Sequence, residues 1–189
     1  MSAGAFWTLM YFATAIVMLF QFRALLQSSS ADYYHPLTQA VTKMTNPLVN
    51  IPVWRNIRLG SFFMAGIIVS LLLSVVIWLF SALVLVNMPI TFALCGALIL
   101  CIKSFGYLLI VLLLVQALCS WLPATRSLSY LLGQATSPIT APVQRIIPPI
   151  GMIDISLMVV LIALYALNAL IYKVLVNVSP ELFFLWRSL

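Results

Sequence analysis

Few residues in this chain of 189 could carry out chemistry. It holds three acidic residues and one histidine, so no Ser-His-Asp set, carboxylate pair or metal-ligand cluster can be assembled from them. It also lacks a glycine-rich phosphate loop. The one ionisable side chain well inside an apolar run is Lys103, and a charge in such a place is a candidate functional residue. We therefore expect a protein that is not an enzyme and that holds no cofactor and no metal.

Lys103 leaves three roles open. On a helix it lies about 27 Å from Trp121, so it can reach the headgroups of the far leaflet if Trp121 marks the near one. It can instead contact a partner helix, or handle an ion or proton, although no acid lies in the apolar runs to complete a proton relay. Gln116 and Asn168 are amides in similar runs, and they are expected to bond to neighbouring helices because lipid offers no hydrogen bonds.

The composition dictates the environment of these residues. The chain is 65% hydrophobic and 6% charged, with a mean hydropathy of +1.19, which indicates an integral membrane protein. Nine Lys and Arg leave a net charge of +6, but they are scattered, so we expect anionic membrane lipids and not nucleic acid as the counter-charge. The three cysteines share one apolar segment, and neither a disulfide nor a metal site is predicted.

Four apolar runs predict an all-α protein with four membrane-spanning helices, at about 4–22, 59–86, 90–122 and 155–176. Arg23 is expected to end the first span. The third is too long for one simple crossing, so it must tilt, protrude or break, and the obvious place for a break is 103–106. In the second span, Gly66, Ser70 and Ser74 form a ladder of small residues that would let another helix approach closely.

A polar segment, 127–154, separates the last two spans. Its apolar residues recur every three or four positions, which predicts an amphipathic helix lying at the membrane surface: Leu128, Leu131, Leu132, Ala135 and Ile139. Four prolines are expected to stop this helix: Pro138, Pro142, Pro148 and Pro149. Gly151 would then allow a tight bend, and Asp154 would cap the fourth span or pair with Arg145 across the loop.

The basic residues predict the orientation of the spans. The first long connection carries Lys43, Arg55 and Arg58, and the third carries Arg126 and Arg145, whereas the short second connection carries none. By the positive-inside rule both long connections face the cytoplasm and both termini the periplasm. Lys43, Arg55 and Arg145 are then placed to bind phosphate headgroups or, as a sharper alternative, to dock a partner protein.

The two long connections also match each other at an offset of 91 positions. Residues 44–48 align with 135–139, and the apolar stripe of the later helix has a counterpart in the earlier one: Leu37, Ala40, Val41, Met44 and Leu48. Residues 52–55 align with 142–145 after a one-residue shift. The chain is thus predicted to be two repeats, 1–87 and 88–189, in the same orientation, each with an amphipathic interfacial helix and a proline-rich loop. The first repeat lacks the Pro-Pro and Gly-x-x-Asp of the second.

These motifs resemble the YggT family of bacterial membrane proteins. The resemblance rests on Thr/Ser-x-Pro followed by Pro-x-x-Arg in both halves, on Ile-Pro-Pro-Ile-Gly-Met-Ile-Asp at 147–154, and on Lys103 followed by Gly106. It implies a small multi-pass inner-membrane protein, linked in some bacteria with cell division or with envelope and osmotic stress. Relatives in plastids are linked with cytochrome maturation and nucleoid distribution. The family name brings no settled biochemical activity.

Two functions remain open. The first is a non-enzymatic protein that assembles with other inner-membrane proteins, or organises them, through its amphipathic helices and proline loops. The second is a transporter or channel subunit for ions or small solutes. Four spans enclose little room, so such a subunit would act as a homo-oligomer with Lys103, Gln116 or Asn168 facing a shared cavity.

Overall fold

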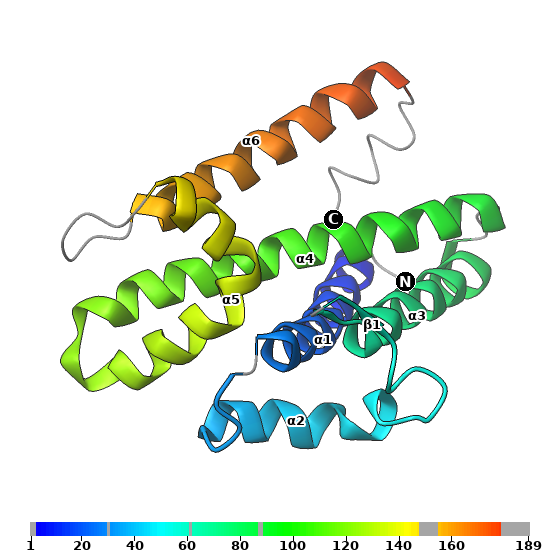
Figure 1. Ribbon diagram of the computed structural model, residues 1–189. Coiled ribbons are helices and arrows are strands. Elements are labelled where there is room, and N and C mark those ends of the chain that lie inside the picture. The colour runs from blue at the N-terminus through cyan, green and yellow to red at the C-terminus, as the bar shows by residue number, and fades with distance from the viewer. Residues whose placement is uncertain (1–2, 30, 61, 87–88, 148–154, 179–189) are drawn as a thin grey trace.

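The computed structural model describes residues 3–29, 31–60, 62–86, 89–147 and 155–178. Almost all of the described chain is helical (Figure 1). The elements follow in the order α1 (Ala3–Ser28), α2 (Pro36–Val49), β1 (Arg58–Leu59), β2 (Phe62–Phe63), α3 (Ala65–Phe80), a π-helical turn η1 (Ser81–Val86), α4 (Ile90–Trp121), a 3-10 turn η2 (Pro123–Thr125), α5 (Arg126–Ile146) and α6 (Ile155–Val178).

Within this described part, four helical stretches are long and apolar enough to cross a membrane. They are Thr8–Ser28, Ala65–Leu83, Ile90–Trp121 and Leu157–Asn177. Three of them have 19 to 21 residues, close to the roughly 20 that a bilayer core requires, and Ile90–Trp121 is longer, with 32. The prediction of a multi-pass helical membrane protein is confirmed, and α2 and α5 are the two long helices outside these stretches.

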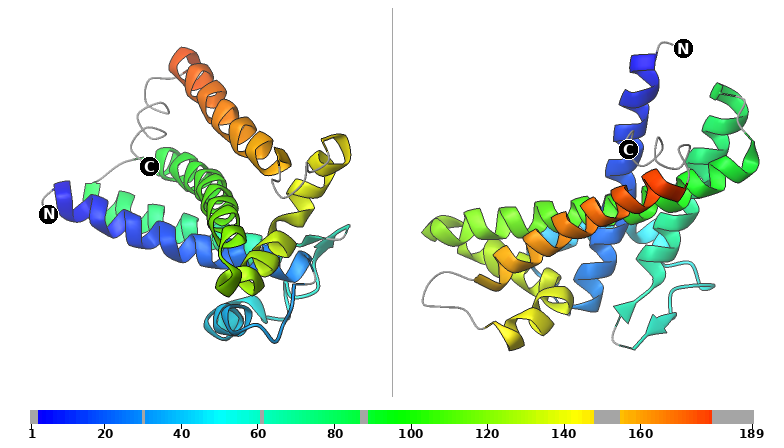
Figure 2. Two further views of the ribbon diagram at one scale, coloured as in Figure 1. Left: turned by 90° about the vertical axis from the view of Figure 1, so that its left-hand side faces the viewer. Right: turned by 90° about the horizontal axis from the view of Figure 1, so that it is seen from above.

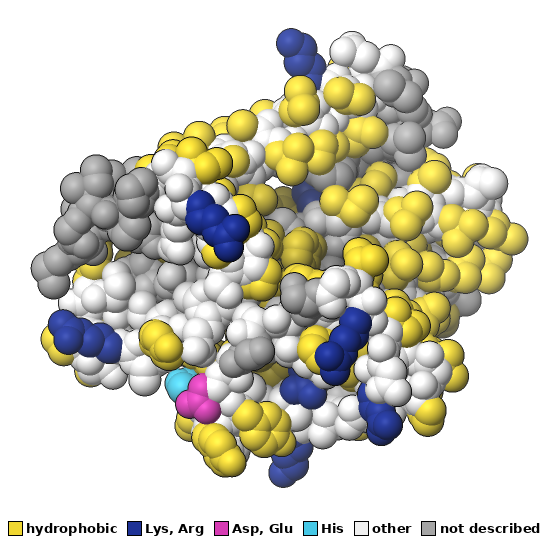
Figure 3. Space-filling model, in the orientation of Figure 1, with side chains coloured by type: hydrophobic (Ala, Val, Ile, Leu, Met, Phe, Trp, Pro, Cys, Tyr) yellow, Lys and Arg dark blue, Asp and Glu magenta, His cyan; other side chains and the backbone are white. Residues whose placement is uncertain are grey.

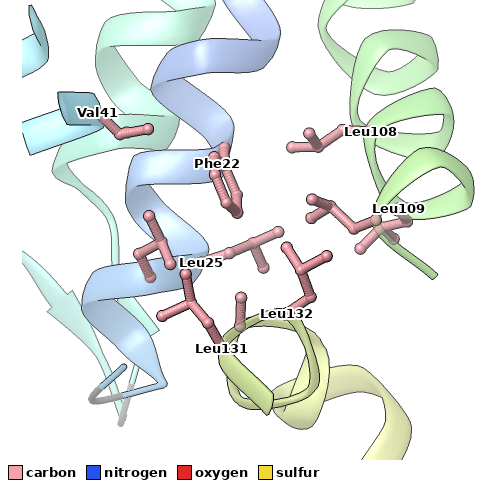
Figure 4. Packing of buried hydrophobic residues seen from close by; sticks show 10 residues of the cluster. Phe22, Leu25, Val41, Leu108, Leu109, Leu131 and Leu132 are labelled. Atoms are coloured by element: carbon pink, nitrogen blue, oxygen red, sulfur yellow. The ribbon is translucent and has the colours of Figure 1, made fainter. Parts of the chain in front are cut away.

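Helix α4 is the element around which the others are arranged. It contacts α1, α3, α5 and α6, while α2 packs mainly on α1. Helix α6 lies at the edge of the molecule, on the side of α4 away from α1 and α2 (Figures 1 and 2). The main apolar core lies where α1, α4 and α5 meet (Figure 4). Phe22, Leu25, Leu108, Leu109, Leu131 and Leu132 point toward one another there, with Val41 of α2 at the rim.

The small-residue ladder of the second span supports a close helix crossing, as predicted. A Cβ on Gly66 would lie 2.5 Å from the backbone oxygen of Phe20, so only glycine fits against α1 at this point. Ser70 and Ser74 are fully buried on the same face of α3. The helix that the ladder admits is therefore α1 of the same chain.

The first span was expected to end at Arg23, but it continues to Ser28. An arginine can stay inside this helix because its Nη1 donates a hydrogen bond to Thr42 Oγ1 on α2.

The second span begins later than predicted, at Ala65, because residues 58–63 form a two-stranded hairpin. Gly60, at φ +62°, supplies the left-handed conformation of its turn.

Of the three alternatives for the third span, a break at 103–106 is excluded, since α4 is one helix of 32 residues. Leu100, Ser104 and Leu108 are all buried along this stretch, so packing continues through it. That packing offsets the roughly 1 kcal/mol by which Gly106 lowers helix propensity. A helix of this length spans about 48 Å, more than a bilayer core, so α4 must tilt or protrude.

The prediction that Pro138 and Pro142 stop the amphipathic helix is also wrong, because α5 runs through both to Ile146. The helix changes direction partway along instead of ending (Figure 1), which is the usual effect of proline inside a helix. Ile139 and Val143 then pack on a core cluster shared with α4 and α6, and this burial offsets the lost hydrogen bonds.

The remaining part of the proline loop lies outside the described residues, namely Pro148, Pro149, Gly151 and Asp154. The two predicted repeats also differ in conformation where their sequences match. Residues 52–55 are in turns after α2, whereas 142–145 are the last turn of α5.

Candidate functional site

A cavity between α4 and α6 is the best candidate for a functional site. Its volume is about 220 Å³. Both helices contribute five residues to its lining: Ile102, Lys103, Gly106, Tyr107 and Ile110 from α4, and Leu164, Tyr165, Leu167, Asn168 and Ile171 from α6. Helix α6 contacts both α4 and α5, so it lies beside the helix that precedes α5 in the sequence. The cavity thus joins positions more than 50 residues apart in the sequence.

Three of the predicted site residues meet in this cavity. Lys103 is half-buried, and its Nζ lies 5.6 Å from the centre of the Tyr107 ring, within the range of a cation–π contact. Gly106 has open space where a Cβ would be, so the missing side chain enlarges the cavity. Asn168 reaches the same space from α6.

The lining determines which chemistry this cavity can support. Lys103 is its only charged residue, beside one amide and two phenols, and the other six residues are apolar or glycine. No carboxylate or histidine is in the lining. A mainly apolar cavity with one cation suits binding, either of an amphiphile or of an ion shared with a second subunit.

Gln116 lies apart from the cavity, at the contact between α4 and α5. Its Oε1 accepts a hydrogen bond of 3.0 Å from Thr136 Oγ1, and its backbone oxygen accepts one of 3.1 Å from Ser129 Oγ. Gly133 makes room for the amide, because a Cβ there would lie 3.2 Å from Gln116 Nε2. Gln116 therefore fastens the amphipathic helix to the span before it.

A buried polar cluster was missed by the sequence analysis. Gln21 is completely buried, donates from Nε2 to the backbone oxygen of Cys101 at 2.8 Å, and accepts from Ser104 Oγ at 3.1 Å. Ser70 Oγ lies 3.7 Å from the Cys101 sulfur, so α1, α3 and α4 all contribute to the cluster. Gln21 is an amide inside an apolar run, and the rule applied to Gln116 and Asn168 would have found it.

The predicted headgroup-binding residues are on the surface, away from the cavity. Lys43, Arg55 and Arg145 are all exposed. Arg145 is in the last turn of α5, where a cation also interacts favourably with the helix dipole. Lys and Arg side chains are spread over the molecule, and several lie over the α2 end of the face in Figure 3. These residues do not form one compact site with Lys103.

His35, the single histidine of the sequence, caps α2. Its Nδ1 accepts a hydrogen bond of 3.2 Å from the backbone nitrogen of Leu37.

Comparison with known proteins finds bacterial relatives that are similar to this chain in sequence. The family model described as CCB3/YggT matches residues 95–175. A protein of Vibrio alginolyticus is 35% identical over 159 residues, which cover 82% of this chain and 85% of that protein. The YggT protein of Escherichia coli K12 is 34% identical, with 84% of each chain covered, and a Haemophilus influenzae protein is 30% identical over 77% of this chain and 79% of its own length. All three are described as uncharacterized proteins, and no solved structure matches the chain.

Proposed function

The chain belongs to the YggT family, and from this premise we propose that it is a non-enzymatic protein of the bacterial inner membrane that assembles with other envelope proteins or organises them. Its partners would be membrane lipids, other inner-membrane proteins and a second copy of the chain. By resemblance, the assembly would serve cell division or the response to osmotic stress.

The observation that carries this proposal is the exposure of α6. Only 6% of the apolar stretch of α6 is buried within the molecule, compared with 39–50% for the other three spans. Its contacts are chiefly with α4 and α5. A span that makes so little contact with its own chain is available to a helix of another protein.

The use of the polar residues supports the same role. Gln21, Ser104 and Gln116 bond between helices of this chain, so they are committed to holding the bundle together. Side chains used in this way do not line a water-filled pathway.

Site-specific photocrosslinking in living cells tests the assembly role. A photoreactive residue would replace Ile162 or Leu170 on α6, which are 65% and 59% exposed, and Phe12 on α1, which is 70% exposed, would serve as the control. We expect protein adducts from the α6 positions and lipid adducts alone from Phe12. Lipid adducts alone from all three positions would contradict the proposal.

The proposal includes an orientation, with α2 and α5 at the cytoplasmic face and both termini in the periplasm. The basic residues of the two long connections support it. Single cysteines at Lys43 and Arg145, in a variant without the native cysteines, should resist a membrane-impermeant thiol reagent in intact cells and react after lysis. Labelling of either position in intact cells would refute the orientation.

A second candidate function is that of a transporter or channel subunit acting as an oligomer, and the cavity that holds Lys103 and Asn168 favours it. Lys103→Leu separates the two candidates. If the wild-type protein carries an ion or solute across reconstituted vesicles and Lys103→Leu abolishes this flux, the chain is a transporter or channel subunit. The assembly role predicts no flux from either protein.

A further inference from the structure

The contact between α1 and α2 is unusually polar for a helix at the end of a membrane span. Arg23 and Gln27 are one turn apart on the same face of α1. The buried face of α2 contributes three threonines, Thr38, Thr42 and Thr45. Arg23 Nη1 donates to Thr42 Oγ1, and this bond joins the two helices. We call the region around Arg23, Gln27, Thr38 and Thr42 the α1–α2 seam.

Polar atoms without a hydrogen-bond partner are concentrated in this seam. Among the described residues, four buried side-chain nitrogen or oxygen atoms lack a partner, and three of them are Arg23 Nε, Gln27 Oε1 and Thr38 Oγ1. Thr38 is only 3% exposed. A buried polar atom without a partner costs about 1–3 kcal/mol, so three on two helices that pack together point to a group that completes them.

We propose that the α1–α2 seam binds the phosphate group of a phospholipid. A phosphate takes hydrogen bonds from guanidinium and hydroxyl donors, and Arg23 Nε and Thr38 Oγ1 are both available as donors. Rotation about the last torsion of Gln27 presents its NH₂ group in place of its oxygen, which adds a third donor.

The depth of the seam fits a headgroup as well. Arg23 lies five residues before the end of the span Thr8–Ser28, which is about 8 Å along the helix. Arginine side chains at this depth reach the phosphate level of the bilayer. Arg23 and Gln27 are both partly exposed, so a phosphate can approach from the outer edge of the seam, and it reaches the buried unpartnered atoms when these side chains turn outward. Lys43, exposed beside Thr42 on α2, adds positive potential at that edge.

Thermal unfolding of the delipidated protein in detergent tests this site. Phosphatidylcholine is the probe, because its zero net charge avoids general attraction to the basic surface. Diacylglycerol with the same acyl chains, and inorganic phosphate, are the comparison ligands. We expect phosphatidylcholine to raise the melting temperature and diacylglycerol to have no such effect. An equal rise with inorganic phosphate would assign the site to a soluble anion instead of a lipid.

Two variants connect that effect to the seam. Arg23→Gln and Thr38→Val each remove a donor, and we expect each to weaken phosphatidylcholine binding by about 10- to 150-fold, the range for a hydrogen bond to a charged group. Arg55→Gln, on the exposed turn after α2, should bind as the wild type does. Thr38→Val also controls for folding, because removal of an unpartnered hydroxyl should leave the lipid-free protein at least as stable. An undiminished lipid effect in Thr38→Val, or an equal effect of diacylglycerol, would overturn the proposal.

Discussion

The two amphipathic helices, α2 and α5, use matching sequence stripes in different ways. In α5, Leu131, Leu132 and Ala135 are at most 2% exposed and belong to the core with α1 and α4. The counterpart stripe in α2 is mostly outside: Met44 is 65% and Leu48 40% exposed. The face of α2 that points inward carries three threonines beside Val41 and Val49. A three-to-four periodicity therefore predicts a helix with an apolar face, but not whether protein or lipid covers that face.

The difference follows from the spans on which the helices pack. Helix α5 lies against α4 and α1, which offer Leu108, Leu109 and Leu25. Helix α2 lies against a stretch of α1 that carries Arg23, so its inner face needs oxygen atoms. Thr42 of α2 aligns with Gly133 of α5. Thr42 supplies a hydrogen-bond acceptor for Arg23, whereas Gly133 makes room for Gln116.

A reciprocal exchange between the helices should have the largest effect. Leu131 aligns with Ala40, and Leu131 is 1% exposed while Ala40 is exposed. We expect Leu131→Ala to lower the free energy of unfolding by about 2–5 kcal/mol, because the shortened side chain leaves an empty space in the main core. Ala40→Leu should change it by about 0.5 kcal/mol or less. Unfolding in mild detergent measures both, and equal effects would show that α2 and α5 are packed alike.

The shared proline gives the next largest effect. Pro47 and Pro138 align, and both are inside helices. Pro47→Ala should raise the free energy of unfolding by roughly 1–3 kcal/mol, because it restores a backbone donor and removes a ring clash. Pro138→Ala makes the same local gain but straightens α5, which moves Ile139 and Val143 from their core cluster. Its net gain should be smaller or negative, and a gain equal to that of Pro47→Ala would mean that the bend contributes nothing.

Sequence reasoning located the elements better than it located their ends. The four spans and the helices α2 and α5 were found from apolar runs and periodicity, which local sequence controls. The helix ends at Arg23 and Pro138 were misplaced because each is decided by a partner far along the chain, Thr42 in one case and the α4–α6 cluster in the other.

The candidate site was predictable in its residues but not in its assembly. Lys103 and Asn168 were chosen as polar residues in apolar runs and Gly106 for its resemblance to a YggT feature, and the cavity brings the three together. The pairing of α4 with α6 depends on how α5 packs beyond its bend, and the prolines indicate where the helix bends but not what it then contacts. Arg23 was interpreted as the end of a span, so its seam with Thr38 and Thr42 was not anticipated.

The aligned threonines Thr45 and Thr136 should show a smaller difference. Both are fully buried and bond to a backbone oxygen of their own helix, but Thr136 also donates to Gln116 on α4. We expect Thr136→Val to cost about 1 kcal/mol more than Thr45→Val, because only the former leaves an amide oxygen unpaired between helices. Adding Gln116→Leu should remove that difference in a double-mutant cycle. A persistent difference would show that the contact between Gln116 and Thr136 does not cause it.

The smallest effects are expected on the surface, where the two halves should still behave alike. Arg55 and Arg145 are both exposed although one is in a turn and the other in a helix. We expect Arg55→Gln and Arg145→Gln each to weaken binding to anionic vesicles by about fivefold, since one cation near such a surface contributes about 1 kcal/mol. Stability should change by about 0.5 kcal/mol or less in both variants. Equal losses require both connections to lie on the same side of the membrane at similar depth, whatever the packing of α2 and α5. A loss in one variant alone would break that equivalence and, with it, the case for two halves in the same orientation.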